Sequence, residues 1–265
     1  MFFFYLLSIH LQFEAYFKYA CPYLISYFGI TQDPKRNYAI VMEYAENGDL
    51  RQYLEDNEVR LYWRQKLDIL RNVVSGLEII HVTGMVHCDL HTGNILQSKD
   101  LLYPSRITDL GLSKKASNEK TSEEPIYGII PYIAPEVLRG DSCTEASDIY
   151  SFAMIMWEVG TGEKPHSNRP YDKGLILDIL EKDLRPKIPE EMPECYANLI
   201  RNCWCKNPRK RPTALEIKAK IMRWQSVLGW FPTAKSRIDG EANQFEDADD
   251  KKNRDISTKS INQVN

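Results

Sequence analysis

The stretch His87–Asn94 reads His-Cys-Asp-Leu-His-Thr-Gly-Asn, and Asp109-Leu110-Gly111 begins fifteen residues after Asn94. A carboxylate next to a substrate hydroxyl can accept its proton, and a second carboxylate with an amide offers the hard oxygen ligands that Mg²⁺ prefers. Phosphoryl transfer from a nucleotide needs both of these parts. The spacing therefore indicates a site of that kind, with the rest of the fold arranged around it.

The bulk composition is that of an ordinary globular chain. Its 265 residues, 43% hydrophobic and 27% charged, suit one large domain or two lobes with a shared core. A formal net charge of −3 lacks the basic footprint of nucleic-acid-binding proteins, so we expect no nucleic-acid partner. The six cysteines show no CxxC pair. We expect reduced thiols in the cytoplasm, with zinc or a disulfide framework as the alternative.

The first thirteen residues, Met1–Phe13, carry no Asp, Glu, Lys or Arg and begin with an apolar run. This stretch is shorter than the roughly twenty apolar residues that a membrane-spanning helix needs. It also lacks the basic start and small-residue cleavage site typical of a signal peptide. We expect a buried apolar strand or helix here and no membrane partner, with a membrane anchor or a signal peptide as the alternative.

Strands are expected mainly in the first part of the chain. Tyr23–Phe28 and Tyr38–Met42 are apolar and β-rich, and Asp33–Asn37 between them has the composition of a turn. Short apolar pieces at 94–97 and 105–108 predict a small hairpin. The remainder is predicted to be mostly helical.

Hydrophobic periodicity locates the helices. Apolar residues recur every three to four positions over 63–82, which indicates a helix with one buried face. Ser147–Val159 is apolar nearly all round and is expected in the middle of a lobe. Further helices are expected over 50–54 (capped by Asp49), 175–180, 195–204 and 214–224. Residues 233–265 have few large apolar side chains, so they are predicted to be a disordered polar tail.

The order of several short motifs is more specific than any one of them. In sequence they are Asp89, Asn94, Asp109-x-Gly111, Ala134-Pro135-Glu136, Asp148, Trp204 and Arg211-Pro212. With this order the chain resembles the eukaryotic protein kinases, most closely their tyrosine-kinase-like branch, from about Leu24 to Trp224. The resemblance implies an α+β, two-lobe domain over 1–232. Its β-rich upper lobe would be truncated, at about 1–45, and its mainly helical lower lobe would cover about 46–232.

The resemblance also implies ATP and Mg as cofactors and a protein hydroxyl as substrate. Asp89 matches the aspartate that accepts the proton of the attacking hydroxyl, and Asn94 and Asp109 match the two magnesium ligands. His91 stands where Ser/Thr kinases have a catalytic lysine, and it can still donate to a phosphate oxygen. Ile129 replaces the threonine that pairs with that lysine, so Ser/Thr specificity is inferred from the family branch alone.

Further positions match the nucleotide site and the framework of the family. Met42 matches the gatekeeper, Glu43-Tyr44-Ala45 the hinge along the adenine edge, and Leu96 the apolar floor under the base. Glu136 and Arg211 match a buried ion pair whose disruption would cost roughly 3–5 kcal/mol. The positions with structural roles are His87, Leu110, Glu136, Arg211 and Asp148, the last expected to hold the backbone of the catalytic loop.

Cys88 replaces an arginine that commonly receives a phosphate on the activation segment in this family. Five hydroxyls of that segment therefore lack their usual docking cation: Ser113, Ser117, Thr121, Ser122 and Tyr127. We expect that phosphorylation of the segment is not required to fold it.

The glycine-rich loop and the strand lysine that grip the phosphates in this family have no match ahead of Gly29. The only lysine upstream is Lys18, and Gln12 falls where the family has a helix glutamate. A pseudokinase scaffold or an inactive fragment is therefore the alternative to an active kinase, and we expect the reading frame to begin inside a longer domain. A two-stranded upper sheet also predicts association through its exposed edge.

Overall fold

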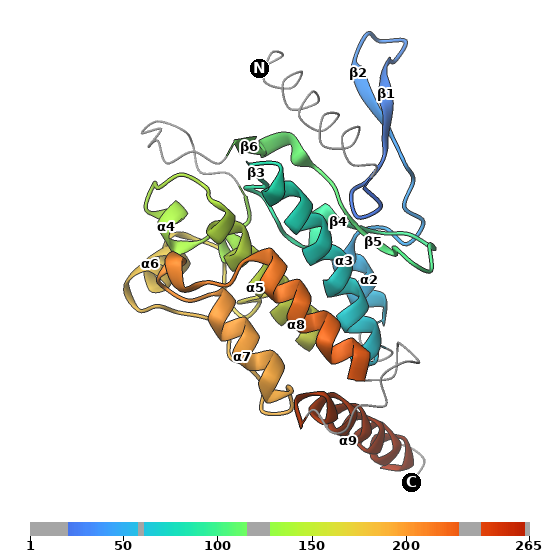
Figure 1. Ribbon diagram of the computed structural model, residues 1–265, viewed down its shortest axis with the longest axis vertical. Coiled ribbons are helices and arrows are strands. Elements are labelled where there is room, and N and C mark those ends of the chain that lie inside the picture. Colours follow the sequence, from blue (N-terminus) through green and yellow to red (C-terminus); the bar gives the residue numbers. More distant parts are fainter. Residues whose placement is uncertain (1–20, 58–60, 116–127, 228–239, 263–265) are drawn as a thin grey trace.

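The computed structural model describes residues 21–57, 61–115, 128–227 and 240–262, and Figure 1 shows their arrangement. Some of the sequence-based expectations fall outside these ranges. They concern the apolar start Met1–Phe13, Gln12, Lys18, and the hydroxyls of Ser117, Thr121, Ser122 and Tyr127. The candidate site residues all fall inside the described ranges.

Two helices, α3 (Trp63–Val82) and α5 (Glu145–Thr161), form the centre of the helical part. Thr144 caps α5, because its Oγ1 accepts the backbone N–H of Ser147 at 3.2 Å. All residues from Ile149 to Val159 are buried. The helix expected in the middle of a lobe is therefore confirmed, and so is the helix expected over 63–82.

Shorter helices surround this pair. Their bounds are Leu50–Asn57 (α2), Pro135–Leu138 (α4), Lys173–Glu181 (α6), Glu194–Cys203 (α7) and Ala214–Val227 (α8), with 3₁₀ turns at Thr92–Asn94, Leu110–Leu112, Ile130–Tyr132 and Pro208–Lys210. α8 packs along α3, and the two lie side by side in Figure 1. Asp49 Oδ1 accepts the Gln52 backbone N–H at 2.9 Å and so caps α2 as expected.

The described residues contain three sheets, each of two antiparallel strands. Their pairs are β1 (Tyr27–Gln32) with β2 (Tyr38–Met42), β3 (Met85–Val86) with β6 (Lys114–Lys115), and β4 (Ile95–Gln97) with β5 (Ser105–Ile107). The β1–β2 hairpin projects from one end of the molecule in Figure 1, away from the helices. A small β part joined to a larger helical part confirms the expected α+β fold.

The first expected strand, Tyr23–Phe28, is displaced along the chain. Tyr27–Gln32 pairs with β2, whereas Leu24 bridges Ile107 of β5 in parallel orientation. The Ile25 N–H donates to Ile107 O, and the Ile107 N–H donates to Tyr23 O, both at 2.9 Å. These bonds satisfy the backbone groups that pairing with β2 would otherwise use. The segment thereby ties the β1–β2 hairpin to β5.

The predicted disorder of residues 233–265 is wrong for Gly240–Asn262, which forms helix α9. Phe245 is fully buried against Trp63 and Trp224, with ring centroids 5.3 and 5.2 Å away. Asp249 accepts the backbone N–H of Trp63 at the start of α3 (3.1 Å). A count of apolar residues misses a helix that one aromatic ring and one capping carboxylate hold in place. Neither α9 nor any other described helix is long and apolar enough to cross a membrane.

Candidate active site

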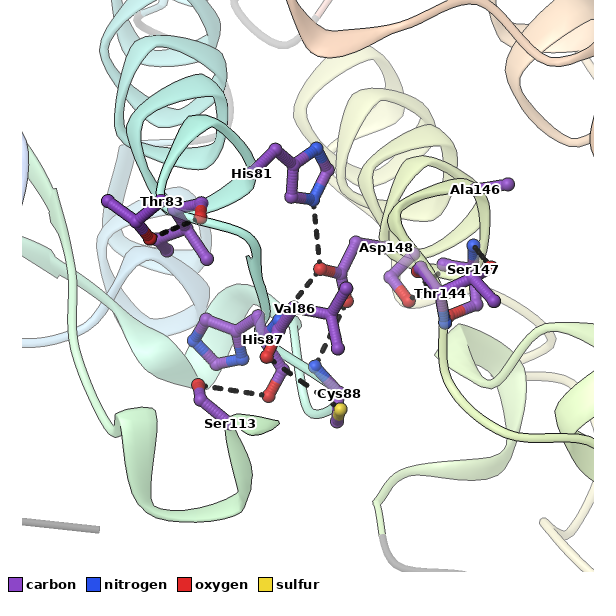
Figure 2. Close-up of polar contacts among 12 residues, drawn as sticks. His81, Thr83, Val86, His87, Cys88, Ser113, Thr144, Ala146, Ser147 and Asp148 are labelled. Atoms are coloured by element: carbon purple, nitrogen blue, oxygen red, sulfur yellow. Dashed lines mark hydrogen bonds and ion pairs between the residues drawn. The ribbon is translucent and has the colours of Figure 1, made fainter. Parts of the chain in front are cut away.

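The expected catalytic loop, His87–Asn94, is bound by one buried carboxylate. This carboxylate belongs to Asp148 of α5, which is 1% exposed. Its Oδ2 accepts the backbone N–H of His87 at 2.7 Å, and its Oδ1 accepts the backbone N–H of Cys88 at 3.0 Å. Figure 2 shows both bonds converging on the Asp148 side chain. Cys88 adopts the left-handed conformation (φ 70°), so these bonds hold a backbone shape that most residues avoid.

His81 is a third partner of this carboxylate, and sequence reasoning missed it. Its Nε2 lies 3.0 Å from Asp148 Oδ2, and Figure 2 shows the ring reaching across from α3. The apolar periodicity of α3 had suggested a packing position for His81. A histidine among apolar residues was the available signal, because a buried imidazole needs a hydrogen-bond partner. The carboxylate thereby joins α3, α5 and the catalytic loop.

His87 links the catalytic loop to the segment before Asp109. Its Nδ1 accepts the backbone N–H of Asp89 (3.3 Å), so the ring proton is on Nε2, which donates to Thr108 O at 3.1 Å. Complete burial lowers the pKa of His87, which favours this neutral form. His87 therefore has a structural role: it connects the loop that contains Asp89 to the segment that leads into Asp109.

Asp89 and Asn94 are in direct contact. Asn94 Nδ2 donates to the Asp89 backbone oxygen at 2.8 Å and lies 3.3 Å from Asp89 Oδ2. With the amide nitrogen used in this way, Asn94 Oδ1 is the atom suited to bind a cation. The amide therefore orients the carboxylate and keeps its own oxygen for a metal.

Asn94 directly precedes β4 and Asp109 follows the end of β5, so the antiparallel hairpin brings both residues to its same end. The Thr108 backbone N–H donates to Asn94 O at 3.0 Å, which sets the register. Asp109 turns the chain in the left-handed conformation (φ 55°). Its backbone N–H donates to Tyr27 Oη at 3.2 Å, a contact from β1 that sequence reasoning did not find.

These two oxygen ligands fit magnesium better than zinc. No group of three or more His, Cys, Asp or Glu side chains in the described parts of the chain could hold a metal ion. An amide and a carboxylate alone leave most of the coordination shell to water and to phosphate oxygens, which is how Mg²⁺ is commonly bound. The donor set therefore fits a magnesium–nucleotide complex.

His91 and Gly128 flank the Asp89 carboxylate. His91 Nδ1 accepts the Gly93 backbone N–H at 3.1 Å, which leaves Nε2 as its donor, 3.7 Å from Asp89 Oδ1. Gly128 has φ +112°, and a Cβ built there would lie 2.9 Å from Asp89 Oδ1. The activation segment therefore approaches the carboxylate so closely that only glycine fits.

A buried carboxylate joins the catalytic loop to the end of the activation segment. Glu158 Oε2 accepts the Thr92 hydroxyl at 3.0 Å and also the Tyr132 hydroxyl. Burial raises the pKa of Glu158, and these two hydrogen bonds oppose that shift. None of these three side chains was singled out from the sequence.

The turn that follows the expected hinge pairs with the end of β4. The Asn47 N–H donates to Gln97 O (3.0 Å), and the Gln97 N–H donates to Gly48 O (2.8 Å). Leu96 faces away from the core that buries Ile95 and Gln97, because side chains alternate along a strand. Half-buried Ala45 starts the turn, in which its carbonyl accepts the Gly48 N–H (3.2 Å).

The expected gatekeeper and the first hinge residue are placed differently. Met42 ends β2 and is 37% exposed. Glu43 forms an ion pair with Arg106 of β5, which also donates to Asp100 Oδ2 at 2.8 Å and to Pro22 O at 3.2 Å. Sequence reasoning missed Arg106, which fastens the hinge to the β4–β5 hairpin.

Glu136 and Arg211 form the expected ion pair. Arg211 Nη1 and Nη2 lie 2.5 and 2.8 Å from the two Glu136 oxygens, and the Arg211 side chain is completely buried. Arg211 also donates to Ala146 O and Cys205 O, so protein hydrogen bonds take the place of water around its charge. Leu110 lies in the hydrophobic core.

Comparison with known proteins agrees with this geometry. Residues 9–221 match the family of protein tyrosine and serine/threonine kinases. This chain belongs to the protein kinase family. Among curated relatives of this kinase domain, a probable serine/threonine-protein kinase of Dictyostelium discoideum is 32% identical over 205 residues, which are 76% of this chain and 27% of the relative.

Two other curated relatives are also named as protein kinases. A putative serine/threonine-protein kinase/receptor of Acanthamoeba polyphaga mimivirus is 34% identical over 71% of this chain and 11% of its own length. Stress-activated protein kinase alpha of Dictyostelium discoideum is 30% identical over 80% of this chain and 34% of its own length. This kinase chain thus spans about a third or less of these three relatives.

Proposed function

We propose that the chain transfers the γ-phosphoryl group of ATP to a serine or threonine hydroxyl of a protein, as a kinase of the tyrosine-kinase-like branch. The observation that carries this proposal is the contact of Asn94 with Asp89, together with the bond from Thr108, the residue before Asp109, to the Asn94 backbone oxygen. A proton acceptor and two oxygen ligands at one place suit phosphoryl transfer. The Ser/Thr assignment is supported by the names of the relatives.

In this proposal each residue has a defined role. Asp89 accepts the proton of the attacking hydroxyl, and the Asn94 amide orients its carboxylate. Asn94 Oδ1 and the Asp109 carboxylate would hold Mg²⁺, which neutralises phosphate charge when it is bound with ATP. His91 Nε2 points to the same place and would donate to a transferred phosphate oxygen.

The hinge would supply the adenine site, with Met42, the backbone of Glu43 and Ala45, and the Leu96 side chain around the base. Support comes from the ion pair of Glu43 with Arg106, from the bonds that join the following turn to β4, and from the outward face of Leu96. A reducing compartment such as the cytoplasm suits the chain, because its six cysteines are present as thiols rather than disulfides.

The test separates nucleotide binding from transfer. With Mg²⁺ and millimolar ATP, we expect a rise in Tm for the unmodified chain and for Asp89→Asn, and no rise for Asp109→Ala. Phosphate incorporation into a generic protein substrate should fall about 10²- to 10⁴-fold in Asp89→Asn. Asp33→Ala, in the exposed β1–β2 turn, is the matched control and should resemble the unmodified chain. Equal transfer by Asp89→Asn would contradict the assigned base.

A second candidate is a scaffold that binds partners without phosphoryl transfer. The observation in its favour is the apolar surface of the β1–β2 hairpin, where Phe28 and Tyr38 are 69% and 59% exposed. Such a surface supports association through the hairpin. If Mg²⁺–ATP produces no rise in Tm and no phosphate is transferred, the scaffold replaces the kinase as the proposed function.

A further inference from the structure

Two cysteine thiols meet where the catalytic loop reaches the start of α5. The Cys88 backbone N–H is fixed to Asp148 in the first turns of that helix (3.0 Å). Cys143 directly precedes Thr144, the residue that caps the same helix. The thiols of Cys88 and Cys143 are hydrogen-bonded to each other, and both residues are half-buried. Figure 2 shows the Cys88 sulfur near the N-terminal end of α5, where Thr144 and Ser147 lie.

The surroundings distinguish the two sulfurs. The pKa of the Cys88 thiol is raised, first by its hydrogen bond with Cys143 and then by burial and by the Asp148 carboxylate, while Lys114 opposes the shift. All of these raising influences disfavour the Cys88 thiolate. Since a thiolate is the attacking species in thiol oxidation, we assign the first attack to the other sulfur, that of Cys143.

We propose that Cys88 and Cys143 form an intramolecular disulfide when the protein meets hydrogen peroxide. The Cys143 thiolate attacks one peroxide oxygen, the O–O bond breaks, and the released hydroxide takes up a proton to become water. Cys88 sulfur then attacks the resulting sulfenic sulfur, the S–S bond forms, and the S–O bond breaks. The Cys88 proton leaves with that hydroxide as a second water. Two thiols are oxidised, and one peroxide is reduced to two waters.

Cys88 is bonded to Asp148 of α5 and Cys143 directly precedes the cap of that helix, so the disulfide would join two segments that meet at the start of α5. The disulfide would close a long loop, between the catalytic loop and the segment ahead of α5, and constrain the unfolded chain. We therefore expect oxidation to raise Tm by roughly 5–10 °C, and a thiol reductant to reverse the change. The site would make the stability of the catalytic loop responsive to peroxide.

The experiment treats the full chain with hydrogen peroxide and reads intact mass, non-reducing peptide maps and Tm, before and after dithiothreitol. The expected result is the loss of two hydrogens, one Cys88–Cys143 linked peptide, and a Tm rise that dithiothreitol removes. Cys88→Ser and Cys143→Ser should each abolish the linked peptide and the Tm rise. Cys205→Ser, another half-buried cysteine, is the matched control and should keep both.

These readouts need no ATP, so they are independent of the proposed activity. The proposal is overturned if peroxide gives no linked peptide in the folded chain, links another pair, or only adds oxygen to Cys143. If Cys88→Ser does not fold, Cys143→Ser decides the matter, because Cys143 lies ahead of α5 and outside the bonds made by Asp148. A linked peptide in folded Cys143→Ser would equally reject the proposal.

Discussion

The two sides of the candidate site are built in opposite ways. Around Asp148, which is 1% exposed, three donors from α3 and the catalytic loop satisfy one buried carboxylate. The β1–β2 hairpin that leads into the hinge is instead mostly exposed, with Phe28 at 69% and Tyr38 at 59%. The contrast indicates that the core fixes the proposed proton acceptor and metal ligands, while the proposed adenine side adjoins a short, exposed hairpin.

The largest expected effect is the loss of the Asp148 carboxylate. Asp148→Ala leaves the backbone N–H groups of His87 and Cys88 buried without an acceptor and removes the partner of His81. Two such orphaned donors and the lost bonds should lower the free energy of unfolding by about 3–6 kcal/mol. Chemical denaturation followed by fluorescence measures this change. A loss under about 1 kcal/mol would show that the carboxylate is not the anchor of the loop.

The matched control is a carboxylate with a similar bonding pattern on the exposed hairpin. Asp33 accepts the Asn37 backbone N–H and the Asn37 side-chain amide, at 2.8 and 2.9 Å. These hydrogen bonds lower the pKa of Asp33, although water surrounds the group. Asp33→Ala should leave Tm almost unchanged, because water replaces the carboxylate as acceptor.

The helical part could be predicted from sequence because its information is local. The apolar periodicity of 63–82 and 147–159 and the caps at Asp49 and Thr144 each reside in one short stretch. The order of Asp89, Asn94 and Asp109 likewise located the candidate site, and the register of one hairpin brings the last two together.

Contacts between distant segments could not be predicted in the same way. Tyr27 with Asp109, His81 with Asp148, and Arg106 with Glu43 join residues more than sixty positions apart. Each partner alone has several possible local roles, and a single sequence does not state which elements meet. The shift of the first strand has the same origin. The backbone groups of Tyr23 and Ile25 bond to Ile107 of β5 instead of pairing with β2.

A smaller effect is expected at α9, which sequence composition assigned to a disordered tail. Phe245→Ala should lower the free energy of unfolding by about 2–3 kcal/mol, less than for a phenylalanine of the central core, because α9 can detach locally. Far-UV circular dichroism and denaturation measure the helix loss and the stability change. Glu246→Ala, at an exposed neighbouring position, is the control and should have little effect. Equal behaviour of the two variants would contradict the packing of α9.

Asp68 gives the helical part a pH-dependent stability. Burial between α3 and α8 raises its pKa to about 7, against Arg71, Arg64 and a hydrogen bond from Gln225 (3.1 Å). The folded chain then binds more protons than the unfolded chain between the unfolded value of 3.8 and about 7, so stability falls as pH rises through that window. Asp68→Asn should flatten this slope, a gain of about 1–2 kcal/mol at pH 8 after solvent screening is allowed for. Denaturation at pH 5 and pH 8 measures it, and an unchanged slope would exclude Asp68 as its source.

The smallest effect is expected on the hairpin itself, at Phe28, and a buried apolar residue three positions earlier, Ile25, gives a direct comparison. Phe28→Ala should change the free energy of unfolding by less than about 0.5 kcal/mol, because most of its ring already contacts water. Ile25→Ala, at a 2% exposed position beside β5, should cost about 2–4 kcal/mol. Denaturation of both variants gives the two values. A large loss for Phe28→Ala would mean that the ring is covered in solution, and a partner surface on the hairpin would then be the first explanation to test, by measuring molecular mass in solution.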